Sequence, residues 1–314
     1  MEWRVRPAVA ADYPRIAEIT TSQLPEPVTA EELQEQEKQL PPDDRFVRLV
    51  VESPEGRVVG ACSCLGSRFL KPGVFRTVIR VDQAYWNQGA GGLLYRELES
   101  WAREHGATHL QAEVREYHPH ALDWAERRGY VVDQHVFESV LTLAGFDPAP
   151  FEGDLRAAEE AGFRFTTLDE LGDDDATLER YFALVTEISE DIPGHEGRPR
   201  PPFELYRNMV RSNKKWSPAR VFIGMDGDRL VASGELLPLE DGGLYHGGTG
   251  VARGYRGRGL SNAIKLVMVQ YALREGARYL RTNNDSRNAP MLAVNRKFGY
   301  KQEPGYFRVT KALV

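Results

Sequence analysis

The 314-residue sequence is poor in cysteine and in long apolar runs, and it has no excess of positive charge, with 40 Lys and Arg against 46 Asp and Glu residues. Its only cysteines, Cys62 and Cys64, lie two positions apart, and neighbours that close rarely form a disulfide, which favours a reduced, cytoplasmic compartment. Two isolated cysteines also lack partners at metal-ligand spacing, so we expect no metal site. No stretch approaches the ~20 apolar residues of a membrane helix, and the charged segment MEWRVRPAVAADY is unlike a signal peptide.

The charge balance and the length further narrow the class of protein to which this sequence can belong. A net charge of −6 and an isoelectric point of about 5.8 argue against a general nucleic-acid-binding protein and are compatible with a cationic substrate. A content of 41% hydrophobic and 27% charged residues is typical of a globular protein. A chain of this length exceeds one ordinary hydrophobic core, so two domains are expected.

An internal repeat supports that expectation. The stretch GTGVARGYRGRGLSNAIKL at 248–266 has a weaker copy, VIRVDQAYWNQGAGGLLYREL, at 78–98. A constant offset of 170 positions relates these pairs: Val81 and Val251, Tyr85 and Tyr255, Gly89 and Gly259, Gly106 and Gly276, Leu110 and Leu280, Gly129 and Gly299, and Tyr130 and Tyr300. An ungapped offset over roughly fifty residues indicates a duplicated unit. We therefore predict an N-terminal domain at 1–146, a linker with one short helix at 147–162 and a C-terminal domain at 163–314.

The glycine-rich turn after Val251 is predicted to join a strand to a helix. A helix start presents backbone N–H groups without internal partners, and the helix dipole adds partial positive charge. Gly257 and Gly259 keep side chains out of that space, and Arg256 and Arg258 add charge, so the turn suits a phosphate. A Walker loop needs a lysine that RGRGLSN lacks, and a dinucleotide fingerprint opens a βαβ unit, whereas this turn follows a predicted antiparallel meander.

The segment 256–261 fits the Gln/Arg-x-x-Gly-x-Gly/Ala pattern of the GNAT superfamily of N-acetyltransferases, with serine in the last position. The later TNNDSRNAPMLAVNRKFGY resembles the next strand and helix of that superfamily. Two copies in one chain are similar to its tandem members. The resemblance implies an α/β fold of the α+β type, with two GNAT-like lobes that are each a mostly antiparallel mixed sheet flanked by helices.

In that superfamily the turn binds the pyrophosphate of acetyl-CoA through backbone N–H groups, and the preceding strand pairs with the pantetheine arm. The resemblance therefore implies acetyl-CoA, or another short acyl-CoA, as co-substrate. It nominates as cofactor-binding residues Val251, Ala252, Arg253, Arg256, Gly257, Arg258, Gly259, Leu260, Ser261, Asn288 and Asn295. In the first copy Trp86, His118 and Ala125 stand at three of these positions, so we interpret the N-terminal lobe as degenerate and the C-terminal lobe as catalytic.

Direct acetylation needs the acceptor amine in its neutral form. Since an alkyl ammonium titrates near pH ~10.4, a base assists at neutral pH, and backbone donors beside the strand stabilise the developing oxyanion. Many GNAT enzymes protonate the leaving thiolate from a tyrosine at the position that Asn295 occupies here. This departure leaves the proton donor open.

Glu235 and His246 are the candidates for the base. If residues 241–242 form a two-residue hairpin turn, the register pairs Leu237 with His246. Glu235 and His246 then lie diagonally on one sheet face, within reach of a shared water. The alternative is that Glu235 is an ordinary strand carboxylate and His246 a hydrogen-bonded sheet residue.

These features predict transfer of an acetyl or other small acyl group from CoA to a primary amine of a small molecule, directly and in a ternary complex. We expect a monomer or homodimer without nucleic-acid or membrane partners. The proline-rich loop Glu190–Phe203 lies where the superfamily closes over its acceptor, and it is either a substrate lid, which favours a small acceptor, or a proline-stiffened connection. Two alternatives stay open: a non-catalytic acyl-CoA-binding or regulatory protein, and a protein N-terminal or lysine acetyltransferase.

Overall fold

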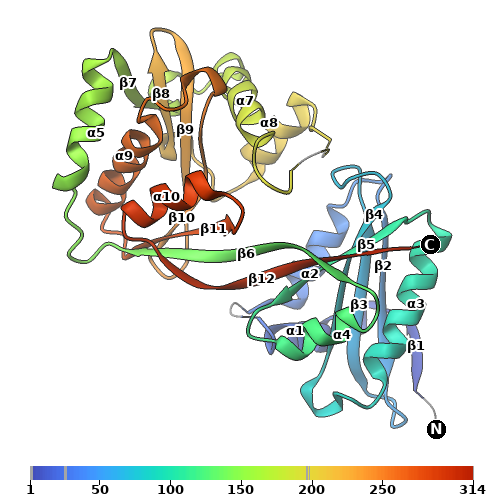
Figure 1. Ribbon diagram of the computed structural model, residues 1–314. Helices are drawn as coiled ribbons and strands as arrows, with labels where there is room; N and C mark the ends of the chain where they lie inside the picture. The colour runs from blue at the N-terminus through green and yellow to red at the C-terminus, as the bar shows by residue number, and fades with distance from the viewer. Residues whose placement is uncertain (1–2, 25–26, 196, 198, 314) are drawn as a thin grey trace. The chain divides into compact units, whose positions relative to one another are not determined.

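The computed structural model describes residues 3–24, 27–195, 197 and 199–313. Its internal packing divides the chain into two units. The N-terminal unit comprises Met1–Asp133 and Phe307–Val314, and the C-terminal unit comprises Gln134–Tyr306. Each unit is an open sheet with helices on its faces (Figure 1), which confirms the predicted fold class.

The C-terminal unit carries the glycine turn. Its helices are α5 (Ala149–Glu160), α6 (Leu168–Leu171), α7 (Asp175–Ser189), α8 (Phe203–Ser212), α9 (Leu260–Arg274) and α10 (Ala289–Lys297). Its strands are β7 (Phe163–Thr167), β8 (Val221–Asp226), β9 (Arg229–Pro238), β10 (Leu244–Val251), β11 (Tyr279–Asp285) and most of β6 (Val131–Thr142), with the first half of β12 (Lys301–Ala312). The strand order is β12-β6-β11-β10-β9-β8-β7, in which β10 and β11 run parallel.

Helices cover both faces of the C-terminal sheet (Figure 1). Helices α5 and α9 pack on one face, while α7 and α8 pack on the other. Because successive side chains of a strand point to opposite faces, Phe222 joins the core under α9 and Ile223 joins the core under α7. Helix α9 is therefore enclosed between the sheet and α5, and its apolar residues point in almost every direction.

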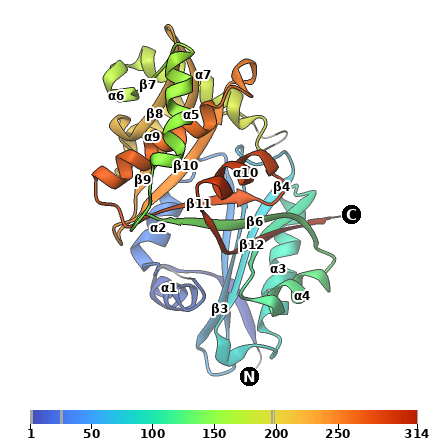
Figure 2. The ribbon, with the colours of Figure 1, turned by 60° about the vertical axis from the view of Figure 1, so that its left-hand side comes forward.

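The N-terminal unit repeats this plan. Its helices are α1 (Tyr13–Thr21), α2 (Ala30–Lys38), α3 (Ala90–Glu104) and α4 (Pro119–Glu126). Its strands, in sheet order, are β1 (Arg4–Pro7), β2 (Arg45–Glu52), β3 (Val58–Gly66), β4 (Val74–Val81), β5 (His109–Arg115) and the end of β12. Figure 2 shows α1 and α2 on one side of β3 and α3 and α4 on the other. Helix α2 begins at a capping box, in which Thr29 Oγ1 accepts from the Glu32 N–H at 3.1 Å.

The structure confirms the 170-residue offset element by element. Strands β4 and β10, helices α3 and α9, strands β5 and β11, and strands β6 and β12 each begin and end 170 positions apart. Both cysteines are free and buried in the N-terminal core, where burial raises the pKa of the Cys62 thiol to about 12. None of the helices in the described ranges has the length and apolar character that crossing a bilayer requires.

The stretch 147–162, predicted as a linker with one short helix, is mostly occupied by α5. Phe151, Leu155 and Ala158 recur on one face of this helix and pack into the core beside α9. The Phe151 ring stacks on Phe298 with centroids 4.2 Å apart. The segment is thus an integral helix of the C-terminal unit, because its apolar residues follow the helical repeat.

The units are also divided elsewhere than predicted, inside β6 and β12. Residues 136–142 of β6 pair antiparallel with β11 in the C-terminal unit. The end of β12 lies next to β5 in the N-terminal unit, where Val309 is buried and the Lys311 ammonium donates to the Tyr95 hydroxyl at 2.6 Å. Alternating apolar residues predict a strand but not the sheet it joins.

Candidate active site

The glycine turn forms the predicted strand–turn–helix connection between β10 and α9. Gly257 and Gly259 have φ angles of 76° and 78°, which side chains rarely adopt. No described atom outside the chain neighbours lies within 4 Å of a Cβ placed at either glycine, and no side chain in the described ranges caps α9. The backbone N–H groups at Leu260 and Ser261 therefore begin a helix beside open space, which fits a phosphate.

Carboxylates that follow α7 contact two arginines of the turn. The Arg253 guanidinium nitrogens lie 2.8 Å from a carboxylate oxygen of Asp191 and 2.9 Å from one of Glu190. An Arg256 guanidinium nitrogen lies 2.6 Å from a carboxylate oxygen of Asp191. Hydrogen bonds from the two guanidinium groups hold the pKa of Asp191 well below its usual range. Arg258 instead lies over an aromatic ring of the same turn, 5.1 Å from its centroid. Much of the positive charge predicted to meet phosphate is thus paired with carboxylates of the chain itself.

The two nominated asparagines make contacts within the chain. Asn288 caps α10, where its side-chain oxygen accepts from the Met291 N–H at 3.3 Å. Asn295 is 2% exposed; it accepts a hydrogen bond from the Lys265 ammonium and donates one to Asn284 at 2.8 Å. The structure therefore brings residues 251–261 together on the turn, while Asn295 points into the interior.

The predicted register of β9 and β10 is wrong by one residue. His246 pairs with Leu236, because the Leu239 N–H donates to the Gly243 carbonyl at 3.0 Å and the turn between them spans three residues instead of two. A bulge follows between His246 and Thr249. Since neighbouring side chains of a strand alternate between faces, Glu235 and His246 lie on opposite faces of the sheet. The predicted pair is therefore not formed.

Glu235 lies half-buried beside the bulge, on the face covered by α7 and α8. A Cβ on Gly247 would stand 2.5 Å from the Glu235 Cγ, so glycine permits this close approach. Burial raises the pKa of the carboxyl group, and a hydrogen bond from the Gly248 N–H opposes the shift. Burial, with the negative charge of Glu235 as a further cause, raises the pKa of three tyrosines: Tyr181, Tyr206 and Tyr245. The carboxylate thus lies in an environment rich in phenol rings.

His246 is 1% exposed beneath α9. Its Nδ1 lies 2.9 Å from the Tyr300 hydroxyl, and its Nε2 lies 2.5 Å from the Thr249 hydroxyl. Burial, followed by the nearby charge of Lys265, lowers the pKa of His246 well below its ordinary value, so the imidazole is neutral at pH 7. An imidazole bonded through both nitrogens within the core is not placed to take a proton on the Glu235 face.

The N-terminal copy of the turn keeps the backbone shape and loses the charge. Asn87, the counterpart of Gly257, has a φ of 61°, and Gly89 has a φ of 95°. Trp86 replaces the arginine, and its indole N–H donates to the Val81 carbonyl at 2.7 Å, as Arg256 donates to the carbonyl of Val251. The recorded pairs of β3 and β4 show no register shift, so this copy also lacks the bulge.

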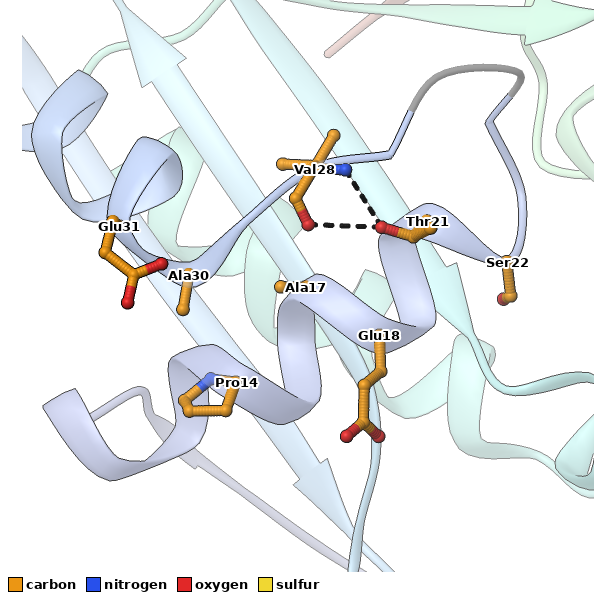
Figure 3. Close-up of a pocket in the computed structure, with 8 residues that line it drawn as sticks. All are labelled: Pro14, Ala17, Glu18, Thr21, Ser22, Val28, Ala30 and Glu31. Carbon is orange, nitrogen blue, oxygen red and sulfur yellow. Dashed lines mark hydrogen bonds between the residues drawn. The ribbon is translucent and has the colours of Figure 1, made fainter.

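A separate pocket of about 610 Å³ lies in the N-terminal unit, between α1 and the segment leading into α2 (Figure 3). At its edge the Thr21 hydroxyl donates to the Val28 carbonyl at 3.1 Å and accepts from the Val28 N–H at 2.9 Å. None of the predicted site residues lines it. Within the part of the chain that the structure describes, no group of three or more His, Cys, Asp or Glu side chains is arranged to hold a metal.

Comparison with known proteins decides the family. The model of the acetyltransferase (GNAT) family matches residues 13–130 and again residues 183–300. The chain belongs to the GNAT acetyltransferase family. A GCN5-related N-acetyltransferase from Sphaerobacter thermophilus is similar in fold, with 22% identity over 99% of this chain and 95% of that chain and a TM-score of 0.72. A tandem GNAT protein from the clavulanic acid biosynthesis pathway has 20% identity over 99% and 98% of the chains and a TM-score of 0.71.

A search of curated proteins found no match to the sequence. The two family matches nevertheless establish the chain as a tandem GNAT N-acetyltransferase, as the motif at 256–261 predicted. Sequence reasoning missed Lys265, which is 1% exposed inside α9. The available signal was a single charged residue in the otherwise apolar run AIKLVMV.

Proposed function

We propose that this N-acetyltransferase binds acetyl-CoA, or another short acyl-CoA, on its C-terminal unit. In this proposal it transfers the acyl group directly to a primary amine of a small molecule in a ternary complex. The observation that carries the proposal is the uncapped start of α9 behind two positive-φ glycines. The backbone N–H groups of residues 259–261 bind the pyrophosphate there, and Arg258 adds charge.

The edge of strand β10 can pair with the pantetheine arm of the acyl-CoA donor. Its parallel pairing with β11 ends at Tyr245 and Arg281. From the bulge to Val251, this edge of β10 is therefore not paired with β11. Backbone groups on a strand edge need partners, and the amides of a pantetheine arm match them. Residues Val251 and Ala252 then lead the donor from the strand to the phosphate-binding turn.

Glu235 is the group that we assign as general base. Acetyl-CoA supplies an acyl carbon that is activated as a thioester. The Glu235 carboxylate takes a proton from the acceptor ammonium, directly or through a water, so that the nitrogen lone pair can attack. Its raised pKa brings it nearer to neutral pH and so improves it as a base. The burial and opposite orientation of His246 favour Glu235 alone in this role.

The surroundings of Glu235 favour a small cationic acceptor. A half-buried carboxylate attracts an ammonium group, and nearby phenol rings add cation–π attraction. The segment after α7 is held in place by Asp191 and by the Pro193 carbonyl, which accepts from the Gln134 amide at 3.2 Å. Residues 196 and 198 of the predicted acceptor loop lie outside the described residues. An anchored segment here limits the room for a folded protein acceptor.

A CoA-release assay against a broad panel of amines tests the proposal. The panel includes small alkyl and aryl amines, amino acids, polyamines and peptides with a free N-terminus or lysine. We expect free CoA thiol to appear with small cationic amines and to depend on Glu235. Acetyl-CoA binding without thiol release across the panel would instead support a non-catalytic acyl-CoA-binding protein. Release with peptides alone would support a protein acetyltransferase.

A further inference from the structure

A cluster of buried polar side chains lies beneath α9, on the sheet face opposite Glu235. Six residues form this buried polar cluster: His246, Thr249, Lys265, Asn284, Asn295 and Tyr300. All but Thr249 are among the buried residues of the C-terminal unit. The Lys265 ammonium donates to the Asn295 side-chain oxygen and lies 4.7 Å from the centroid of the Tyr300 ring.

The cluster lies where β10 and β11 separate. His246 and Thr249 flank the bulge of β10, and Asn284 lies on β11 beyond its last recorded pair with β10. Lys265 comes from the second turn of α9, whose first turn carries the phosphate-binding N–H groups of the proposed function. The reacting end of a donor laid along this gap therefore comes to rest over the buried polar cluster.

The fold does not require these polar groups. In the N-terminal unit, 170 residues earlier, Tyr95 occupies the position of Lys265. Val114 and Ala125 occupy the positions of Asn284 and Asn295. All three side chains are buried in the N-terminal core. Because an ammonium in an interior is costly unless it is well paired, packing alone does not explain Lys265.

We propose that Lys265 is the acid that protonates the sulfur of coenzyme A as the acyl group leaves, an inference that rests on the proposed function. The acceptor nitrogen forms the new C–N bond, and the electron pair of the broken C–S bond stays on sulfur. The acceptor ammonium gives one proton to Glu235 before the attack, and the nitrogen releases a second proton to water once the C–N bond has formed. Lys265 Nζ gives one proton to sulfur and becomes a neutral amine. Release of the Glu235 proton to water and uptake of one proton from water by Lys265 restore both groups, with one proton released overall.

The groups that face Lys265 are compatible with this exchange. Burial lowers the pKa of Lys265 to about 7, so both of its forms are accessible at neutral pH. From β10 it faces the neutral His246, and from the turn before β12 it faces Tyr300, whose pKa is raised by burial. Helix α5 presents the apolar Phe151 to the same core. Asn295, which accepts the Lys265 hydrogen bond, is a positioning residue.

Two measurements on the full-length protein test the assignment. In K265M and K265Q we expect kcat with acetyl-CoA to fall about 100-fold, as for loss of a general acid, while KM for acetyl-CoA is little changed. The second readout is the pKa of the thiol in bound CoA, followed by ultraviolet absorbance of the thiolate. We expect this pKa to be higher in both variants than in the wild type, because the ammonium stabilises the thiolate. K311M is the matched control, since Lys311 contacts Tyr95, the N-terminal counterpart of Lys265.

An unchanged kcat in both Lys265 variants, or a lower kcat with an unchanged thiol pKa, would overturn the assignment. Circular dichroism and the Kd for CoA establish that the variants fold. A wild-type protein that binds CoA but transfers to no amine would refute the proposed function separately. The thiol titration would even then decide whether Lys265 lies beside the sulfur.

Discussion

Glu235 and Lys265 are titratable groups on opposite faces of the C-terminal sheet, and burial shifts the pKa of each toward neutrality. Glu235 is half-buried beside the bulge of β10, whereas Lys265 is 1% exposed beneath α9. A base on one face and an acid on the other fit a reaction that removes a proton from nitrogen and adds one to sulfur. Each group makes a separate prediction.

For Glu235 we expect E235Q to lower kcat by about 10²–10⁴-fold without weakening CoA binding, because an amide cannot accept the proton. The wild-type kcat should fall as the pH drops through the raised pKa of Glu235, and this acid limb should disappear in the variant. A pH series of kcat measures both effects. E240Q, which alters a 94% exposed side chain in the same hairpin, serves as the control, and an E235Q enzyme with near-wild-type kcat would remove Glu235 from the mechanism.

Lys265 should also make stability depend on pH. Its pKa is 10.5 when exposed and about 7 in the fold, so between these values the unfolded state binds the extra proton and stability rises with pH. The shift corresponds to about 5 kcal/mol at most. Urea unfolding at pH 7 and pH 10 measures the free energy of unfolding of the wild type and of K265M. We expect the wild-type value to rise relative to that of K265M as the pH increases. A difference independent of pH would mean that Lys265 is not buried as described.

At the scale of elements, the end of α7 and the glycine turn are joined by ion pairs. Asp191 contacts both Arg253 and Arg256, and the Arg253 N–H also donates to Glu187 at 2.8 Å. A carboxylate on these guanidinium groups competes with a phosphate for the same donors. Binding of the donor at the turn is thereby coupled to the position of the segment that follows α7.

This coupling predicts that D191N binds CoA severalfold more tightly than the wild type, because the competing charge is removed. Calorimetry at low salt measures the effect, which should shrink as added salt screens the exposed pairs. D173N, which removes another exposed partner of an arginine in the same unit, should leave CoA affinity unchanged. Weaker binding by D191N would show that the carboxylate orients the arginines toward the phosphate instead.

The elements themselves could largely be predicted from the sequence, and their pairing could not. The glycine-rich turn after Val251 correctly predicts a strand before it and a helix after it, as β10 and α9 show. The register and the Glu235–His246 pair were wrong, because the turn spans residues 240–242 and its residue pattern also suits a two-residue turn at 241–242. The stretch 147–162 was predicted as a linker with only a short helix, because its proline and glycine residues outweighed the spacing of its apolar residues.

At the scale of the whole molecule, two copies of one unit have diverged. The 170-residue offset is visible in the sequence because ungapped glycines and aromatics keep their phase. The division of the chain inside β6 and β12 is not visible there, because a strand's own residues do not specify its partner. The N-terminal copy keeps a left-handed residue at Asn87 but has an indole at Trp86 and alanine at Ala125.

Matched substitutions in the two turns test most directly the claim that the C-terminal turn binds the donor. G257V/G259V and N87V/G89V place the same strained side chains at equivalent left-handed positions, so equal backbone strain is built into both proteins. We expect the C-terminal pair to abolish CoA binding in calorimetry and thiol release, and the N-terminal pair to leave both largely intact. Loss of CoA binding in the N-terminal pair, with retention in the C-terminal pair, would contradict the account.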